Sequence, residues 1–348
     1  MNRKNQIIIS IIALIGLSIV ILTSSKYQQE TSLESGQLFL PNLKANLSQV
    51  DKVVIQHSGN KPISLIKSGD KWGVAEKSGY KANFPAIRKV LLELSQAELF
   101  EAKTQKEKNY IHLGVEEVTQ EKGSGSRITI YSKDKVLEDV IIGRYRINKG
   151  TYLRKANQHK SWLTLSKLIV ESRFIEWLDK DILNINEDNI QSVAYTPALG
   201  AKYEISRQVN KEGYKILYDG KVAAPKDQRA TANLARLISE IKPVDVAPRV
   251  DGIDSAEVFS TRVYNTFDGL TITITCSKQK EGKAAQISFD FATSQQDSSS
   301  QIVELVKKYK QEISPWLFTI DDSIFGKLNK KLEDIADMDS YSAEDAAN

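Results

Sequence analysis

The chain has 348 residues, of which 41% are hydrophobic and 26% charged, and its formal net charge at pH 7 is +4. This composition excludes a largely disordered chain, and the length is sufficient for two domains with separate cores. The small net charge argues against a nucleic-acid partner, because such a partner needs a concentrated basic surface. The single cysteine, Cys276, excludes an intramolecular disulfide and is expected to be a small buried apolar residue of a strand.

The N-terminal segment carries a targeting signal. Arg3 and Lys4 precede an apolar run at 7–22, and no charge follows until Lys26. The uncharged stretch is long enough to cross a hydrocarbon core of roughly 30 Å, so residues 1–25 are predicted to form a cytoplasmic N-terminus and a transmembrane anchor. The positive charges before the run place the rest of the chain outside the cytoplasm. A cleaved signal peptide is the alternative, although the run is longer than the usual signal core.

Residues 26–37 are polar and are predicted to form a tether, and residues 38–185 a first α+β module. Short segments rich in β-branched and aromatic residues within 50–77 predict an antiparallel meander. A helix with Asn83 as its N-cap follows, and further strands are predicted within 127–166, before a helical stretch at 167–178. The first helix should pack on the meander through an apolar stripe made of Ile87, Val90, Leu91 and Leu94.

Residues 186–330 repeat this order and predict a second α+β module, so that the chain is expected to contain a tandem duplication. Strands are predicted within 189–220 and 262–293, on either side of a helix that begins after Pro225. The residues at 331–348 become acidic and are predicted to form a flexible tail. The buried face of the second helix is expected to consist of Ala230, Leu234, Leu237, Ile238 and Ile241.

The sequence contains no recognisable catalytic or cofactor motif. Its three histidines, His57, His112 and His159, lie far apart and have no second ligand at metal-binding spacing. A nucleophile elbow, a P-loop and a dinucleotide fingerprint are absent, and neighbouring acidic residues are interpreted as caps. We therefore expect a protein that is not an enzyme and binds no metal or cofactor. A hydrolase would require a cleft that gathers distant carboxylates.

One basic segment is the candidate interaction site. Cations alternate with tyrosines along a predicted hairpin, and such a surface suits anionic lipid headgroups, a polyanionic envelope polymer or an acidic partner. The alternative is an edge hairpin whose charges only keep it soluble. The candidate residues are Arg144, Tyr145, Arg146, Lys149, Tyr152, Arg154 and Lys155.

An ordered series of segments extends over nearly all of the chain beyond the anchor. It comprises "GQLFLPNLKANLSQVDKVVIQ", "GDKWGV", "ANFPAIRKVLLELSQAEL", "YIHLGVE", "VIIG", "GTYLRK" and "EWLDKDILNINEDNIQSV". The series resembles the bacterial domain-of-unknown-function 4340 family. That family offers no catalytic residues to carry over, and the resemblance implies an envelope protein often encoded beside components of gliding-motility-type ABC transporters.

The predicted anchor, the two predicted modules and the family resemblance together predict a single-pass protein of the bacterial inner membrane. Its N-terminus should be cytoplasmic and most of its chain periplasmic. We expect a non-enzymatic accessory or scaffold subunit of an ABC-type transport assembly, with protein partners in that membrane complex and no nucleic acid. The alternative function is an extracytoplasmic binding module for a polyanionic envelope polymer or an anionic lipid.

Overall fold

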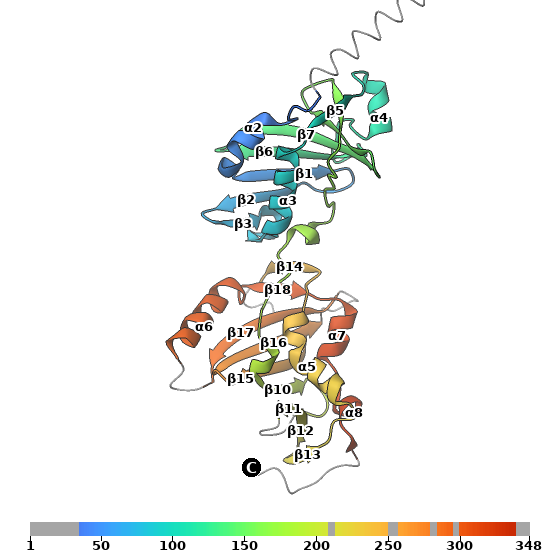
Figure 1. Ribbon diagram of the computed structural model, residues 1–348. Helices are drawn as coiled ribbons and strands as arrows, with labels where there is room; N and C mark the ends of the chain where they lie inside the picture. Colours follow the sequence, from blue (N-terminus) through green and yellow to red (C-terminus); the bar gives the residue numbers. More distant parts are fainter. Residues whose placement is uncertain (1–34, 208–212, 250–256, 279–283, 295–298, 339–348) are drawn as a thin grey trace, which may run out of the picture. The chain divides into compact units, whose positions relative to one another are not determined.

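A computed structural model describes residues 35–207, 213–249, 257–278, 284–294 and 299–338 of the chain. The chain divides into two compact units between Leu178 and Asp179. Each unit contains a nine-stranded antiparallel sheet together with helices, so the predicted α+β class is confirmed (Figure 1). The predicted anchor at 1–25 lies outside the described residues, and none of the described helices combines the length and apolar character that a membrane span requires.

The first unit orders its strands as β4-β3-β2-β1-β6-β7-β8-β9-β5. Its elements, in chain order, are α2 (Pro41–Asn46), η1 (Leu47–Gln49), β1 (Lys52–His57), β2 (Ile63–Ser68), β3 (Lys71–Val74), η2 (Ala75–Lys77), β4 (Tyr80–Lys81), α3 (Phe84–Ser95), β5 (Leu99–Ala102), η3 (Glu107–Asn109), α4 (Tyr110–Leu113), β6 (Ser126–Ser132), β7 (Lys135–Arg146), β8 (Gly150–Lys155), β9 (Ser161–Thr164) and η4 (Phe174–Trp177).

Helix α3 confirms the amphipathic helix that the sequence predicts. The Asn83 side chain accepts a hydrogen bond from the backbone N–H of Ala86 at 3.2 Å, which caps the helix. Figure 1 shows the helix lying across one face of the sheet. The expected stripe is buried, since Ile87, Val90, Leu91 and Leu94 are all in the core.

The second unit orders its strands as β13-β12-β11-β10-β15-β16-β17-β18-β14. Its elements are η5 (Glu187–Asn189), β10 (Ile190–Pro197), β11 (Tyr203–Arg207), β12 (Tyr214–Tyr218), β13 (Lys221–Ala223), α5 (Gln228–Glu240), β14 (Asp245–Pro248), β15 (Glu257–Thr266), β16 (Leu270–Lys278), β17 (Gln286–Thr293), α6 (Ser300–Glu312), β18 (Trp316–Thr319), α7 (Asp322–Leu328) and α8 (Leu332–Ile335).

The two sheets share one topology. Each strand of the first sheet has a counterpart at the same place in the second, from the edge strands β4 and β13 to the opposite edge strands β5 and β14. Helices α3 and α5 also correspond, because each follows the four-stranded meander and precedes the other edge strand. A tandem duplication of one module would produce this repetition.

Two predictions about helices need correction. The stretch 167–178 is not an α-helix, because its only helical element is the 3-10 turn η4. At its start, the Leu168 N–H donates to the Thr151 hydroxyl on β8 at 3.0 Å, so the backbone there bonds to the sheet and not to a helical turn. In α5, Ala230 is exposed, whereas Thr231 and Ala235 join the buried face.

The second unit begins earlier than the predicted boundary at 185/186. In the segment 179–185, Ile182, Leu183 and Ile185 are buried. The carbonyl of Ile185 accepts a hydrogen bond from the Ser239 hydroxyl of α5 at 2.7 Å. This segment therefore packs as part of the second unit.

Residues at both ends of the described chain are more ordered than predicted. At the predicted tether, the Gly36 N–H donates to the Leu99 carbonyl of β5 at 2.8 Å. At the predicted flexible tail, Leu332 and Ile335 of α8 are buried, and Ala336 forms a β-bridge with Pro225. The tail at 331–338 is therefore packed on the second unit, and residues 339–348 lie outside the described part.

Candidate functional site

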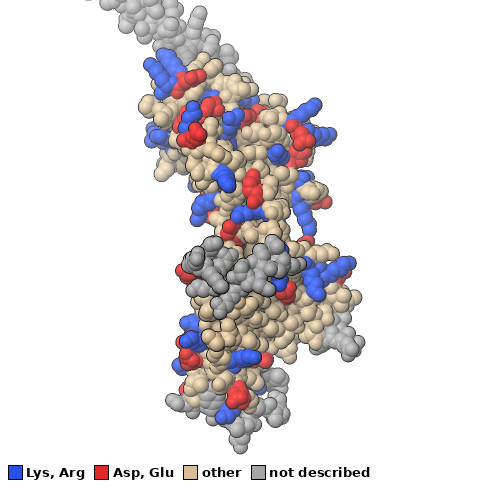
Figure 2. Space-filling model, turned by 180° about the vertical axis from the view of Figure 1, so that it is seen from behind, with Lys and Arg blue, Asp and Glu red and all other residues tan. Residues whose placement is uncertain are grey.

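The structure separates the predicted basic patch into an exposed and an internal group. Strands β7 and β8 form the predicted hairpin, on which Arg144, Arg146 and Lys149 are exposed. Tyr145 and Tyr152 are half-buried. On the face drawn in Figure 2, basic and acidic residues are interspersed over both units, without a large area of one sign. The remaining two residues of the patch, Arg154 and Lys155, have partners inside the fold.

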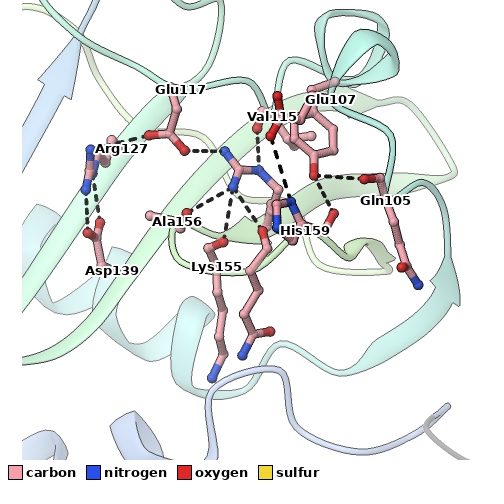
Figure 3. Close-up of polar contacts among 12 residues, drawn as sticks. Gln105, Glu107, Val115, Glu117, Arg127, Asp139, Lys155, Ala156 and His159 are labelled. Atoms are coloured by element: carbon pink, nitrogen blue, oxygen red, sulfur yellow. Dashed lines mark hydrogen bonds and ion pairs between the residues drawn. The ribbon is translucent and has the colours of Figure 1, made fainter.

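Arg154 is buried and holds several parts of the first unit together (Figure 3). Its guanidinium forms an ion pair with Glu117 at 2.7 Å and lies over the Tyr110 ring, 4.7 Å from its centroid. It also donates to the backbone carbonyls of Val115, Lys155, Ala156 and Gln158. These contacts satisfy a buried cation and give Arg154 a structural role.

The network continues from Glu117 along the sheet. Glu117 also contacts Arg127 at 3.5 Å, and Arg127 binds both carboxylate oxygens of Asp139, at 2.9 and 2.6 Å (Figure 3). The hydrogen bond with Asp139 raises the pKa of Arg127. Beside it, burial raises the pKa of Glu138, and the ion pair with Lys155 at 3.4 Å opposes that effect. Lys155 is therefore also committed to a partner within the fold.

The histidines do not form a common site. His57 lies between the Ser126 hydroxyl, 3.1 Å from its Nδ1, and the Glu171 carbonyl, 3.2 Å from its Nε2. Burial lowers the pKa of His57, and the bond with the Glu171 carbonyl opposes this effect. Among the described residues, no cluster of three histidine, cysteine or acidic residues could hold a metal ion.

The second unit contains a groove that the sequence analysis did not predict. The groove has a volume of about 740 Å³ and lies among β10, the loop at 198–201, the start of β15 and helices α7 and α8. Its apolar lining includes Tyr195, Pro197, Leu199, Val258, Phe259 and Phe325. Leu199 is 93% exposed, and the Phe259 and Phe325 rings contact each other with their centroids 5.1 Å apart. The sequence signal was the apolar loop "TPALGA", which is unusual for a solvated turn.

A polar cluster lies behind one wall of this groove. Tyr195, which lines the groove, pairs with Arg262 across β10 and β15, and its ring centroid is 4.9 Å from the guanidinium. Arg262 is only 1% exposed. It donates to the Leu328 carbonyl at 2.7 Å and to the Tyr203 hydroxyl at 3.2 Å. Within the described part of the chain, Arg262 has no ion pair with a carboxylate.

The tyrosines of this cluster are neutral at physiological pH. Burial raises the pKa of Tyr264 to about 12, while the adjacent Arg262 opposes the shift. Burial also raises the pKa of Tyr195 and of Tyr203. The charge of Arg262 is therefore balanced mainly by the last carbonyls of α7, whose helix end carries partial negative charge.

The corresponding place in the first unit is entirely aliphatic. Val50 and Ile190 each come directly after the 3-10 turn that leads into the equivalent strands β1 and β10, so these two residues correspond. The cross-strand residue pairs of each sheet then extend this correspondence to the neighbouring strands. In this alignment, Ile55, Ile63, Ile128 and Ile130 correspond to Tyr195, Tyr203, Arg262 and Tyr264. The shared topology therefore forms without an arginine–tyrosine cluster.

Comparison with known families identifies a match. The model described as a domain of unknown function (DUF4340) matches residues 72–257, which is more than half of the 348 residues. The match runs from β3 of the first unit to the start of β15 in the second. Neither a curated protein nor a solved structure matches the chain.

Proposed function

The chain belongs to the domain-of-unknown-function 4340 family, and we propose that it is a membrane-anchored accessory or scaffold subunit of an ABC-type transport assembly. In this proposal a single N-terminal helix anchors it in the bacterial inner membrane, and the two units act in the periplasm without enzymatic activity. The basic residues and apolar run at the N-terminus support the anchoring.

The groove of the second unit is the observation that carries the binding function. Its mouth exposes Leu199, Val258 and Phe259 together, next to the apolar lining of the groove. A protein gains about 25 cal/mol for each Å² of apolar surface that a partner removes from water. The proposed occupant is an apolar segment of a protein subunit in the same membrane assembly.

The comparison between the units strengthens this assignment. A fold that forms with four isoleucines in one unit has no structural need for Arg262 and its tyrosines in the other. Arg262 bonds to the carbonyls that end α7, and α7 supplies Phe325 to the groove. Arg262 therefore acts as a positioning residue that fixes one wall of the groove.

In-cell crosslinking tests the proposal, followed by affinity purification in mild detergent and identification of partners by mass spectrometry. We expect the unchanged protein to recover ABC permease or ATPase subunits, and Leu199→Asp to lose them. Leu199 is almost fully exposed, so this change leaves the core intact. Ile66→Asp, which alters an exposed apolar residue of the first unit, is the matched control and should retain the partners. Recovery of the protein alone, despite efficient crosslinking elsewhere, would contradict the proposal.

A further inference from the structure

The end of the first unit at which β7 and β8 join exposes several large apolar side chains. Ile147 in the hairpin turn is 77% exposed, Leu165 after β9 is 66% exposed, and Phe100 on β5 is 47% exposed. Isolated apolar side chains are common on protein surfaces, whereas a group at one end of a domain indicates a contact surface.

Backbone contacts place these three residues at the same end of the sheet. Gly150, which follows the hairpin turn, packs so closely that a Cβ there would lie 2.9 Å from the Leu165 Cα. Leu165 and Phe100 line one depression together, and Leu99 pairs with Thr164 across β5 and β9. The hairpin turn, the end of β9 and the start of β5 therefore form one surface.

This surface also carries exposed cations. Arg144, Arg146 and Lys149 are exposed on the hairpin. Lys167 lies over the ring of Tyr145 at 5.7 Å. Glu98 is the acidic residue that lines the adjoining depression. We call Phe100, Arg144, Arg146, Ile147, Lys149 and Leu165 the tip surface.

The chain enters the first unit at the tip surface. The Ser35 hydroxyl donates to the Phe100 carbonyl at 3.3 Å, and Gly36 pairs with Leu99. In the sequence, Ser35 lies ten positions after the end of the uncharged N-terminal stretch at residue 25. Ten residues span at most about 35 Å when fully extended. An anchored chain would therefore hold the tip surface close to the bilayer.

We infer that the tip surface rests on the bilayer and binds anionic phospholipid headgroups, with Ile147 and Leu165 inserted at the interface. Cations beside exposed aliphatic residues are the combination that favours an anionic membrane surface. A polyanionic polymer would be attracted by the cations but would leave the aliphatic residues in water. The inference rests on the membrane anchoring of the proposed function and is independent of the transport partner.

The test uses the full chain in lipid nanodiscs, with an environment-sensitive fluorophore attached to Ile147→Cys. Native Cys276 is buried, so the unchanged protein controls for labelling at that thiol. Nanodiscs of phosphatidylcholine alone are compared with nanodiscs that also contain phosphatidylglycerol, and both contain a lipid-bound quencher. Val136→Cys is the matched control, because Val136 is exposed near the opposite end of β7.

We expect a blue shift and strong quenching of the label at 147 in the anionic nanodiscs, weaker quenching in phosphatidylcholine and little quenching at 136. The combined substitution Arg144→Glu, Arg146→Glu and Lys149→Glu should abolish the difference between the two lipids. Equal quenching at 147 and 136, or equal quenching at 147 in nanodiscs with and without phosphatidylglycerol, would overturn the inference.

Two further outcomes separate this inference from its premise. A labelled protein that fails to co-elute with nanodiscs refutes the anchoring, and the inference with it. A protein that co-elutes, shows no quenching at 147 and yet responds there to added heparin as a polyanionic probe refutes only the lipid contact. That result would assign the cations of the tip surface to a polymer.

Discussion

Arg154 and Arg262 are both buried, yet their surroundings differ. Arg154 has a carboxylate partner, Glu117, and crosses from β8 to the connection at 103–125. Arg262 relies on backbone carbonyls and a tyrosine hydroxyl. A buried guanidinium is costly unless acceptors match its donors, and Arg262 leaves its Nη1 without a hydrogen-bond partner in the described part of the chain. Sequence alone does not separate Arg154 from its exposed neighbours on the hairpin, because Glu117 lies 37 positions away.

Arg154→Met is expected to destabilise the first unit by about 2–4 kcal/mol, because it leaves Glu117, the buried Val115 carbonyl and three partly buried carbonyls without their donor. Denaturant unfolding followed by tryptophan fluorescence measures the change. Arg146→Met, on the exposed part of the same hairpin, is the control and should alter stability by no more than about 0.5 kcal/mol. Equal effects of the two substitutions would show that Arg154 has no special structural role.

His57 is expected to make the first unit less stable in mild acid. Burial lowers the pKa of His57 in the folded state, so the unfolded chain takes up the proton at higher pH. The stability that neutral His57 contributes is therefore fully present above the unfolded value of 6.5 and decreases as the pH falls below it. Unfolding free energies measured from pH 7.5 to pH 5 should fall less in His57→Gln than in the unchanged protein.

His159 provides the control for this pH dependence. Its side chain is exposed, and its ring is 3.9 Å from Glu107. His159→Gln should retain the pH dependence of the unchanged protein, because this variant leaves the buried His57 and its partners in place. The role given to His57 would be wrong if the two glutamine variants lost the dependence equally.

At the scale of elements, the sequence predicts a helix best where the spacing of apolar residues agrees with the residues that begin or end a helix. Asn83, Pro85 and the stripe of α3 agree, and the helix is confirmed. Helix α6 was missed because it follows a polar segment at 294–300, although Ser299 caps it and Ile302 and Val306 follow helical spacing. The stretch 167–178 was wrongly predicted as helical because tertiary hydrogen bonds to Thr151 outweigh its apolar pattern.

The N-cap of α3 gives a test at this scale. Asn83→Ala removes the bond from Ala86 and the side-chain donation to the Glu176 carbonyl at 3.1 Å. We expect a loss of about 1–2 kcal/mol in the unfolding free energy of the first unit. Asn83→Asp keeps an acceptor for the helix but cannot donate to Glu176, so its loss should be intermediate. Unfolding curves of the three proteins distinguish the contributions, and equal stability of all three would refute them.

For the whole chain, repetition was predictable and the groove was not. Repeated spacing of strands and helices is visible in sequence, and both sheets have the expected meander. The groove combines β10, β15, α7 and α8, and its lining residues Tyr195 and Glu333 are 138 positions apart. Its position depends on strand pairing and on where α7 crosses the sheet, and neither follows from local periodicity. Leu199, an apolar residue in a loop, is a local feature of the sequence that indicates the groove, and the structure exposes it.

Because each unit has its own sheet and core, we expect the two units to unfold in separable transitions. Trp72, Trp162 and Trp177 lie in the first unit and Trp316 in the second, so Trp316→Phe makes fluorescence report the first unit alone. In that background Arg154→Met should lower the urea midpoint that fluorescence reports for the first unit. The circular dichroism change that comes from the second unit should keep its urea midpoint.

The reciprocal change acts on the second unit. Asp227 caps α5 by accepting hydrogen bonds from Arg229 and Ala230. Asp227→Ala should therefore lower only the transition that fluorescence does not report, by about 1 kcal/mol. If either substitution shifted both signals together by the same amount, the units would unfold as one cooperative body and the repeated sheets would not be independent folding units.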